Sequence, residues 1–253
     1  MQLIEISLVM ILLGLLLGFV GAGGSGFIIA ILTVVFGYPI HTALGTALAA
    51  MFFSSLSGSV SHYREGNMVL KTGILVGASG AMGAWFSSGW SSFIPEEKLG
   101  WMTSGMLFAS GLALWFRMAF MGKQAAQNGV PAATITWRYA VNAVLVGGVT
   151  GALSGLFGIG STPFIQLGLM VLLGLPMRYA AGTTMLVIIP IALAGGAGYF
   201  TLGYLDVPLL LAVVAGTMSG SYVGAKFTKR VPVAWLKVCM VVTPMIGATI
   251  LLL

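Results

Sequence analysis

The chain has 253 residues, of which 58% are hydrophobic and only 6% are charged. Because a soluble domain carries about 25% charged residues, this composition excludes a water-soluble protein and predicts an all-α polytopic membrane protein. The net charge of +6 does not indicate a nucleic-acid partner, since the basic residues lie in short loops, and the single Cys239 excludes an internal disulfide and a cysteine-based metal site.

The first half of the chain, residues 1–121, is predicted to be a transmembrane repeat made of a broken helical hairpin and three transmembrane helices. A Gly-rich turn that begins at Gly21 interrupts the first apolar run, and Gly37-Tyr38-Pro39 ends the second. Polar loops then separate the later helices. The expected helices cover residues 4–20, 26–36, 40–62, 68–90 and 96–120.

Residues 122–136 are the least apolar stretch, and we interpret them as a cytoplasmic linker. The second transmembrane repeat, residues 137–253, follows the order of the first. Its short helix is expected to begin at Ser161-Thr162-Pro163, with a hydroxyl residue as the cap and proline at the first helical position, and to end before Gly174. The other expected helices cover residues 137–156, 177–200, 207–225 and 233–253.

The two halves carry the same glycine and proline pattern at one fixed spacing. Pro39 and Pro176 are 137 residues apart, and the same spacing aligns the Gly-rich stretch 18–26 with 155–163. Glycine and proline fix backbone geometry, so these matches mean more than leucine or valine matches in an apolar chain. The sequence therefore predicts a fused duplication. Four further glycine pairs keep this spacing: Gly14 with Gly151, Gly58 with Gly195, Gly66 with Gly203, and Gly83 with Gly220.

Basic residues predict which loops face the cytoplasm. Arg64, Arg138 and Arg230 mark three such loops, whereas the loops at Glu96 and Asp206 are acidic. Equivalent loops of the two halves thus differ in charge, which predicts an inverted-topology repeat, as in many secondary transporters. Each broken hairpin then enters and leaves on one side of the membrane. Its short second leg favours a re-entrant hairpin, and we expect the two tips to meet near the midplane.

The two hairpin tips form the candidate substrate site. A short helix that starts inside a membrane points unpaired N–H groups and about half a positive charge at a cavity. Glycines let a ligand approach, and hydroxyls add donors, so the tips predict an anion site without a buried basic side chain. For each residue alone, helix packing or capping is the competing interpretation. The predicted substrate-binding residues are Gly23, Gly24, Ser25, Gly26, Thr46, Gly160, Ser161, Thr162 and Thr183.

Other polar residues are weaker candidates. His41 and Arg178 align in the two halves and suit a gate or pathway role at opposite mouths, although interfacial placement explains them as well. His62 and Tyr63 are interpreted as interfacial. Because no acidic residue lies deep in a predicted span, the sequence argues against an Asp or Glu proton relay and against an enzyme such as a membrane hydrolase. We expect no cofactor and no metal.

The chain resembles the TauE/SafE family of sulfite and organosulfonate exporters. The resemblance rests on the Gly18–Gly26 turn, the Gly-Tyr-Pro and Gly-Leu-Pro segments at 37–39 and 174–176, and the Gly-Thr pairs at 45–46 and 182–183. It covers almost the whole chain, and the two-fold repeat is itself typical of the family. The resemblance implies a secondary transporter of the bacterial inner membrane that exports a small sulfur-containing anion such as sulfite, thiosulfate or sulfoacetate.

Two other functions stay open from the sequence. The first is a channel or transporter for another small solute, including a cation bound by the tip carbonyls. The second is a non-transporting membrane scaffold subunit, although a scaffold does not need two polar tips at one depth. A homodimer, the direction of transport and the driving ion are also left open.

Overall fold

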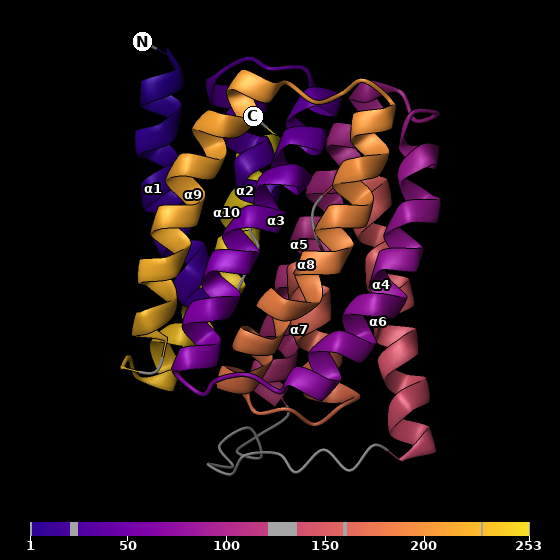
Figure 1. The fold of residues 1–253 in the computed structure, drawn as a ribbon, viewed down its shortest axis with the longest axis vertical. Coiled ribbons are helices and arrows are strands. Elements are labelled where there is room, and N and C mark those ends of the chain that lie inside the picture. Colours follow the sequence, from indigo (N-terminus) through magenta and orange to yellow (C-terminus); the bar gives the residue numbers. More distant parts are fainter. Residues whose placement is uncertain (1, 21–24, 121–135, 159–160, 229, 253) are drawn as a thin grey trace.

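A computed structural model describes residues 2–20, 25–120, 136–158, 161–228 and 230–252. This part of the chain contains helices and no strands, and Figure 1 shows an upright bundle. The first half holds α1 (Gln2–Val20), α2 (Ser25–Ala30), the π-helix η1 (Ile31–Val35), α3 (Ile40–Arg64), α4 (Leu70–Ser91) and α5 (Glu96–Phe120). The second half holds α6 (Trp137–Phe157), α7 (Thr162–Val171), α8 (Met177–Thr201), α9 (Val207–Phe227) and α10 (Val233–Leu251).

The all-α prediction is confirmed, and each expected helix is found with its ends shifted by a few residues. Proline and glycine set the clearest boundaries. Pro39 and Pro176 directly precede α3 and α8, and Gly37 and Gly174 have φ angles of 71° and 67°, which glycine adopts without strain. The pattern does not predict the π-helix. The predicted linker, residues 122–136, lies almost entirely outside the described residues.

The protein is a multi-pass membrane protein. Seven helices in the described residues are long and apolar enough to span a membrane, within α1, α3, α5, α6, α8, α9 and α10. Large apolar side chains point outward, and Leu12, Phe86 and Trp137 expose 70%, 73% and 81% of their surface. Such a surface is unfavourable in water and suits contact with lipid. The second legs of the hairpins, Ser25–Val35 and Thr162–Val171, are shorter.

The antiparallel helices α3 and α8 lie at the centre of the bundle (Figure 1). They are the most buried of the seven spans, with 67% of each apolar window inside the protein. Leu48 near the start of α3 faces Gly195 near the end of α8, and Gly58 near the end of α3 faces Met185 near the start of α8. The central pair of helices is therefore built from both halves of the chain at each of its two ends.

Two matched helix pairs flank this centre, α1 with α9 and α4 with α6 (Figure 1). Glycines bring the backbones together in both pairs. A Cβ at Gly14 would meet the backbone of Thr217 at 2.6 Å, and a Cβ at Gly151 would overlap the backbone of Gly80. Small residues allow this close packing of helices in lipid. The pairs correspond under the repeat, because Gly14 and Gly151 are equivalent positions.

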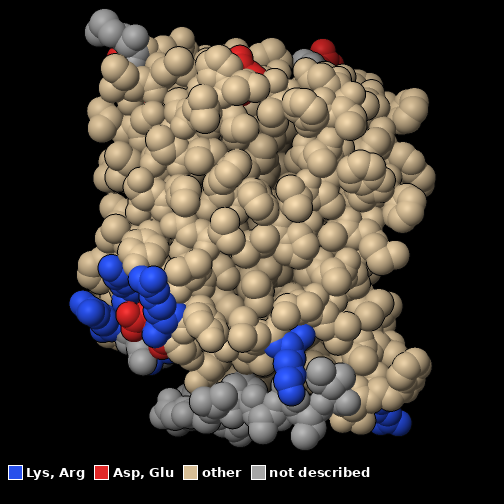
Figure 2. All heavy atoms as spheres, viewed as in Figure 1, with Lys and Arg blue, Asp and Glu red and all other residues tan. Residues whose placement is uncertain are grey.

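Charge distinguishes the two ends of the bundle. On the face drawn in Figure 2, Lys and Arg lie toward the lower end, and acidic side chains mark the upper edge apart from one group among the bases. We call the end that carries Arg64 and Lys226 the basic end, and the end that carries Asp206 the acidic end. Arg64 Nη1 donates to the Tyr222 hydroxyl at 3.0 Å, and Lys226 Nζ lies 4.6 Å from the centre of the same ring. In Figure 1, α1 begins at the acidic end and α6 at the basic end.

Candidate functional site

The second hairpin tip lies between α6 and α7, and the two residues described there, Gly158 and Ser161, are both left-handed. Gly158 follows α6 with a φ of 63°, and its N–H donates to the Ser154 carbonyl at 2.9 Å, a common glycine ending of a helix. Ser161 precedes α7 with a φ of 44° and a ψ of 26°, a conformation that costs a non-glycine residue about 1 to 2 kcal/mol. The fold therefore holds Ser161 in a strained backbone, which is typical of functional sites.

The hydroxyls of Ser161 and Thr162 at this tip are buried. Ser161 and Thr162 expose 0% and 2% of their surface, and within the described part of the chain neither hydroxyl makes a hydrogen bond. The predicted capping arrangement is wrong in detail, because α7 begins at Thr162, Pro163 is its second residue and Ser161 precedes it without a side-chain cap. Both hydroxyls are thus available for a ligand.

Ser25 is the first described residue after the end of α1. It begins α2 and is fully buried. Its hydroxyl likewise finds no partner among the described residues. Gly26 is required for packing, since a Cβ there would meet the Leu107 side chain of α5 at 2.6 Å. Three further predicted site residues lie outside the described residues: Gly23, Gly24 and Gly160.

The equivalent threonines Thr46 and Thr183 are both fully buried but differ in their partners. The Thr183 hydroxyl accepts a hydrogen bond from the Val69 N–H at 3.0 Å, directly before α4. Thr46 has no side-chain partner in the described structure. Thr183 therefore has a structural role at the start of α4, while Thr46 keeps its full bonding capacity.

The end of α1 is held by three side chains from distant parts of the chain. The last carbonyls of a helix have no partner within the helix, and in a membrane an unsatisfied carbonyl is unfavourable. His62 Nε2 donates to Gly18 O at 3.2 Å, Thr228 Oγ1 to Phe19 O at 2.7 Å, and Gln166 Nε2 to Val20 O at 3.0 Å. These donors come from α3, the segment after α9, and α7. They fix the helix end directly before the first tip.

Gln166 and Ser154 are polar residues near the tips that the sequence interpretation misses. Gln166 lies one turn after Thr162, and its bond to Val20 brings the start of α7 against the end of α1. A single amide in an otherwise apolar short helix was the signal that could have identified it. Ser154 is fully buried in the last turn of α6, and its side chain has no partner within the described residues. No glycine or proline pattern points to Ser154.

The first legs of the two hairpins end toward opposite ends of α3. A Cβ at Gly158 would contact Leu44 near the start of α3, whereas Gly18 bonds His62 near its end. These α3 residues are about five helical turns apart. Most residues of the tips lie outside the described residues, so the expectation that the tips meet near the midplane stays a prediction. The second tip is joined to the first through α7 and Gln166.

His41 and Arg178 lie in the first turns of α3 and α8. The His41 ring stacks on Tyr204 with centroids 4.7 Å apart and planes 20° from parallel. Arg178 Nη2 donates to Val231 O at 3.3 Å. Both side chains join neighbouring segments at opposite ends of the bundle. His62 is not interfacial as predicted, because it is fully buried, whereas the neighbouring Tyr63 is 60% exposed.

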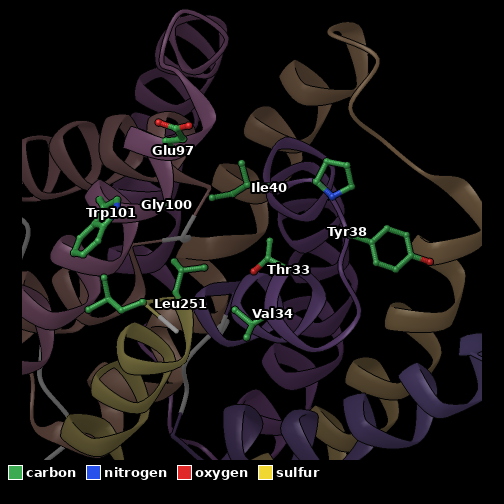
Figure 3. A pocket seen from close by; sticks show the side chains of 10 residues that line it. Thr33, Val34, Tyr38, Ile40, Glu97, Gly100, Trp101 and Leu251 are labelled. Atoms are coloured by element: carbon green, nitrogen blue, oxygen red, sulfur yellow. The ribbon is translucent and has the colours of Figure 1, made fainter.

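A pocket of about 400 Å³ lies between η1, α5 and α10. Figure 3 shows the Glu97 carboxylate and the Tyr38 ring on different sides of it. None of the predicted site residues lines this pocket, so it is separate from the tips. Among the described residues, no group of three His, Cys, Asp or Glu could hold a metal ion. The pocket is lined by Thr33, Val34, Tyr38, Pro39, Ile40, Glu97, Gly100, Trp101, Leu251 and Leu252.

Three relatives of the chain are named as probable membrane transporter proteins. The chain is 52% identical to the probable membrane transporter protein YdhB of Bacillus subtilis, over 98% of this chain and 99% of that protein. It is 25% identical to the probable membrane transporter protein MJ0441 of Methanocaldococcus jannaschii, over 91% and 90%. A probable membrane transporter protein of Xylella fastidiosa is 24% identical over 87% of this chain and 82% of its own length.

No solved structure matches the chain. The model of the family described as sulfite exporter TauE/SafE matches residues 6–251. This match covers both broken hairpins and both central helices. The names of the relatives and of the family describe transport and not catalysis. The chain therefore belongs to the TauE/SafE family and is a membrane transporter for a small solute, not an enzyme.

Proposed function

We propose that this transporter exports a small sulfur-containing anion, such as sulfite, thiosulfate or an organosulfonate like sulfoacetate, across the bacterial inner membrane. The observation that carries the proposal is a set of buried hydroxyls without partners among the described residues, at the starts of α2 and α7: Ser25, Ser161 and Thr162. The family description, sulfite exporter, supports the choice of substrate class.

Hydroxyl and backbone donors suit an anion in an apolar setting. A buried hydroxyl without a partner is unfavourable, and an anion offers acceptors to several such donors together. The start of α7 adds unpaired N–H groups and the positive end of the helix dipole. The sequences of α2 and α7 contain no Lys or Arg. The anion would thus be held without a buried cation, which permits its release.

The contacts at the end of α1 argue against a cation at the same place. A cation site built from tip carbonyls needs oxygens that are free to coordinate. The carbonyls of Gly18, Phe19 and Val20 already accept hydrogen bonds from side chains. A cation would have to compete with these donors, whereas an anion would find at Ser25 a hydroxyl that has no partner among the described residues.

The matched packing of the two halves supports an inverted-topology repeat, with the basic end in the cytoplasm. α1 with α9 and α4 with α6 are equivalent pairs, and α1 and α6 start from opposite ends of the bundle (Figure 1). Such repeats suit alternating access, in which one site opens to either side in turn. The site proposed here lies along α7 between the second tip and the end of α1.

A thermal-shift experiment on the purified protein tests the substrate class. Sulfite, thiosulfate, sulfoacetate and taurine are each added, with chloride salts of simple cations as controls. A ligand at a hundredfold excess over its dissociation constant stabilises the folded protein by about 2.7 kcal/mol. We expect at least one sulfur oxyanion or sulfonate to raise the melting temperature. A rise with cations alone would replace the proposed function with cation transport.

A further inference from the structure

The pocket between η1, α5 and α10 lies where three membrane spans begin or end. Ile40 and Glu97 are the first residues of two spans, and Leu251 is the last residue of a third. All three residues line the pocket. Arg64, at the other end of α3, marks the basic end of the bundle, so the pocket lies at the acidic end. Because the apolar part of a span ends where the lipid head groups begin, the pocket lies at the depth of the head groups.

Glu97 is the one charged side chain among the described residues that line the pocket. No hydrogen bond or ion pair joins its carboxylate to another described residue. A basic pocket at a membrane surface favours anionic lipid head groups, and by the same Coulomb attraction an unpaired carboxylate favours a cation. The pocket is therefore unsuited to the anion proposed as the solute, and it suits a cationic group.

Thr33 supplies a second oxygen to the pocket, and this oxygen is an acceptor. The Thr33 hydroxyl donates to Ile29 O at 2.8 Å. Because a hydroxyl has one hydrogen and two lone pairs, the Thr33 oxygen can then only accept from a ligand. Figure 3 shows the Tyr38 hydroxyl pointing away from Thr33 and Glu97. A primary ammonium has three N–H donors and no acceptor, so it matches a carboxylate and a hydroxyl oxygen better than a quaternary ammonium does.

Trp101 and other apolar side chains continue the pocket toward the lipid. Trp101 lies one helical turn after Glu97 on the same face of α5, and an indole ring attracts a nearby cation. Val34, Leu252 and Trp101 line the pocket and expose 42%, 48% and 69% of their surface. The volume of about 400 Å³ is within the range of small-molecule pockets. The pocket therefore combines a site for a cationic group with a surface for apolar chains.

We propose that this pocket binds the ammonium head group of a membrane phospholipid, such as phosphatidylethanolamine, in the leaflet at the acidic end. The ammonium donates to the Glu97 carboxylate and to Thr33 Oγ1 and lies against Trp101. The acyl chains run over the exposed apolar side chains. The lipid thereby contacts η1, α5 and α10 together, three elements that are far apart in the chain, and its binding stabilises their packing.

Lipid binding measured by native mass spectrometry on the detergent-purified protein tests the charge preference. The protein is titrated with phosphatidylethanolamine or with the anionic phosphatidylglycerol, both with the same acyl chains. We expect the parent to bind phosphatidylethanolamine more tightly. Glu97→Gln keeps the size of the side chain and removes its charge, so it should weaken this binding about tenfold, the equivalent of one lost charged hydrogen bond. Glu5→Gln changes another exposed carboxylate that does not line the pocket, and it should bind like the parent.

A second pair of variants fills the pocket instead of changing its charge. A Cβ at Gly100 meets Ile40 Cδ1 at 3.5 Å, which is an ordinary contact, and Gly100 lines the pocket. Gly100→Leu should therefore leave the protein folded and abolish the preference for phosphatidylethanolamine. Gly105→Leu is the control on the same helix, because a Cβ at Gly105 meets nothing within 4 Å and Gly105 does not line the pocket. It should bind like the parent.

Soluble phosphoethanolamine separates the whole lipid from its head group alone. It has no acyl chains, so it should bind about a hundredfold more weakly than the lipid. Equal binding of the two would overturn the lipid as the occupant. Equal binding of the two lipids by the parent, or a Glu97→Gln protein that binds like the parent, would overturn the site itself. Should Gly100→Leu fail to fold, Glu97→Gln against Glu5→Gln still decides. No sulfur anion is added, so failure of the proposed function leaves these results unchanged.

Discussion

The ends of α1 and α6 occupy equivalent places in the repeat but are completed in different ways. Three side chains from other elements bond Gly18, Phe19 and Val20 at the end of α1. At the end of α6, the left-handed Gly158 bonds back to Ser154, and Tyr199 bonds Leu156. The first hairpin therefore depends on distant parts of the chain, and the second is completed largely by its own backbone. Among the described residues, more side chains bond the end of α1 than the end of α6.

The second legs differ as well. α7 is a regular helix, whereas the equivalent leg continues from α2 into the π-helix η1. Thr33 Oγ1 donates to Ile29 O at 2.8 Å within this leg, and such bonds bend helices. The position equivalent to Thr33 is Met170, which has no hydroxyl. The duplicated sequence thus gives two second legs of different helix geometry.

The largest expected effect concerns the orientation of the halves. Single cysteines at Asn128 and Thr201, in a Cys239→Ala background, should react with an impermeant reagent from opposite sides of the membrane. Asn128 should react from the cytoplasm, since basic loops stay inside. Asn128 lies outside the described residues, and Thr201 ends α8. If both cysteines react from the same side, the two halves do not have opposite orientations in the membrane.

The next largest effect, on stability, is expected at the equivalent glycines Gly45 and Gly182 near the starts of α3 and α8. Gly182→Ala and Gly45→Ala each place a Cβ against the backbone carbonyl of the opposite half, Asn67 O or Tyr204 O. Overpacking of this kind destabilises by about 1 to 3 kcal/mol. Thermal unfolding in detergent should show the loss, and it should be larger for Gly182, where the overlap is closer.

Gly105→Ala is the control for these two substitutions, because a Cβ at Gly105 meets nothing within 4 Å. It should leave the unfolding temperature nearly unchanged. If all three variants unfold alike, close backbone contact at Gly45 and Gly182 is not what makes glycine necessary there. These two positions would then tolerate more movement than the structure indicates.

Much of the fold follows from the sequence because its boundaries are local. Pro39, Pro176 and the left-handed Gly37 and Gly174 mark helix ends through their own backbone preferences. Apolar length then identifies the spans. These features need no knowledge of distant residues, so the order and extent of the helices could be predicted.

The site is less predictable because its partners are remote in the chain. The end of α1 is completed by residues 62, 166 and 228, and no local pattern links them to Gly18. The tip residues Ser25, Ser161 and Thr162 could be predicted from the sequence because glycine and proline mark their turns. Thr183 was predicted because it lies early in its span, but its bond to Val69 depends on how α4 packs.

A smaller effect, on anion affinity, is expected from substitutions at the two tips. Ser25→Ala and Thr162→Ala each remove a buried hydroxyl that has no partner among the described residues. Neither change breaks a capping bond, so both proteins should stay folded. Each should weaken anion binding roughly tenfold, equivalent to about 1.4 kcal/mol, as measured by thermal shift against anion concentration.

Ser219→Ala is the matched control for the tip hydroxyls, since the Ser219 hydroxyl bonds Ala215 O within α9 and the residue is exposed. Its anion affinity should equal that of the parent. If Ser25→Ala and Thr162→Ala bind as tightly as the parent, backbone N–H groups alone would have to form the site. A loss in only one of them would assign the anion to one tip.

The smallest effect concerns Ser161, whose equivalent in the first half is Gly24. Ser161 has a φ of 44°, so Ser161→Gly relieves backbone strain and should stabilise the protein by at most about 1 kcal/mol. Ser161→Ala keeps the strain and removes the same hydroxyl. If the hydroxyl binds the anion, both variants should bind less tightly, and only the glycine variant should unfold at a higher temperature.

The Ser161→Gly and Ser161→Ala variants test why the second half has serine at the position where the first half has Gly24. Strained residues cluster at functional sites, and Ser161 differs from glycine in carrying a buried hydroxyl directly before α7. The measurement is a thermal-unfolding series with and without the anion that stabilises the parent. A Ser161→Gly protein that is more stable and binds equally well would show that the hydroxyl does not contact the substrate. The asymmetry at this position would then have no part in anion recognition.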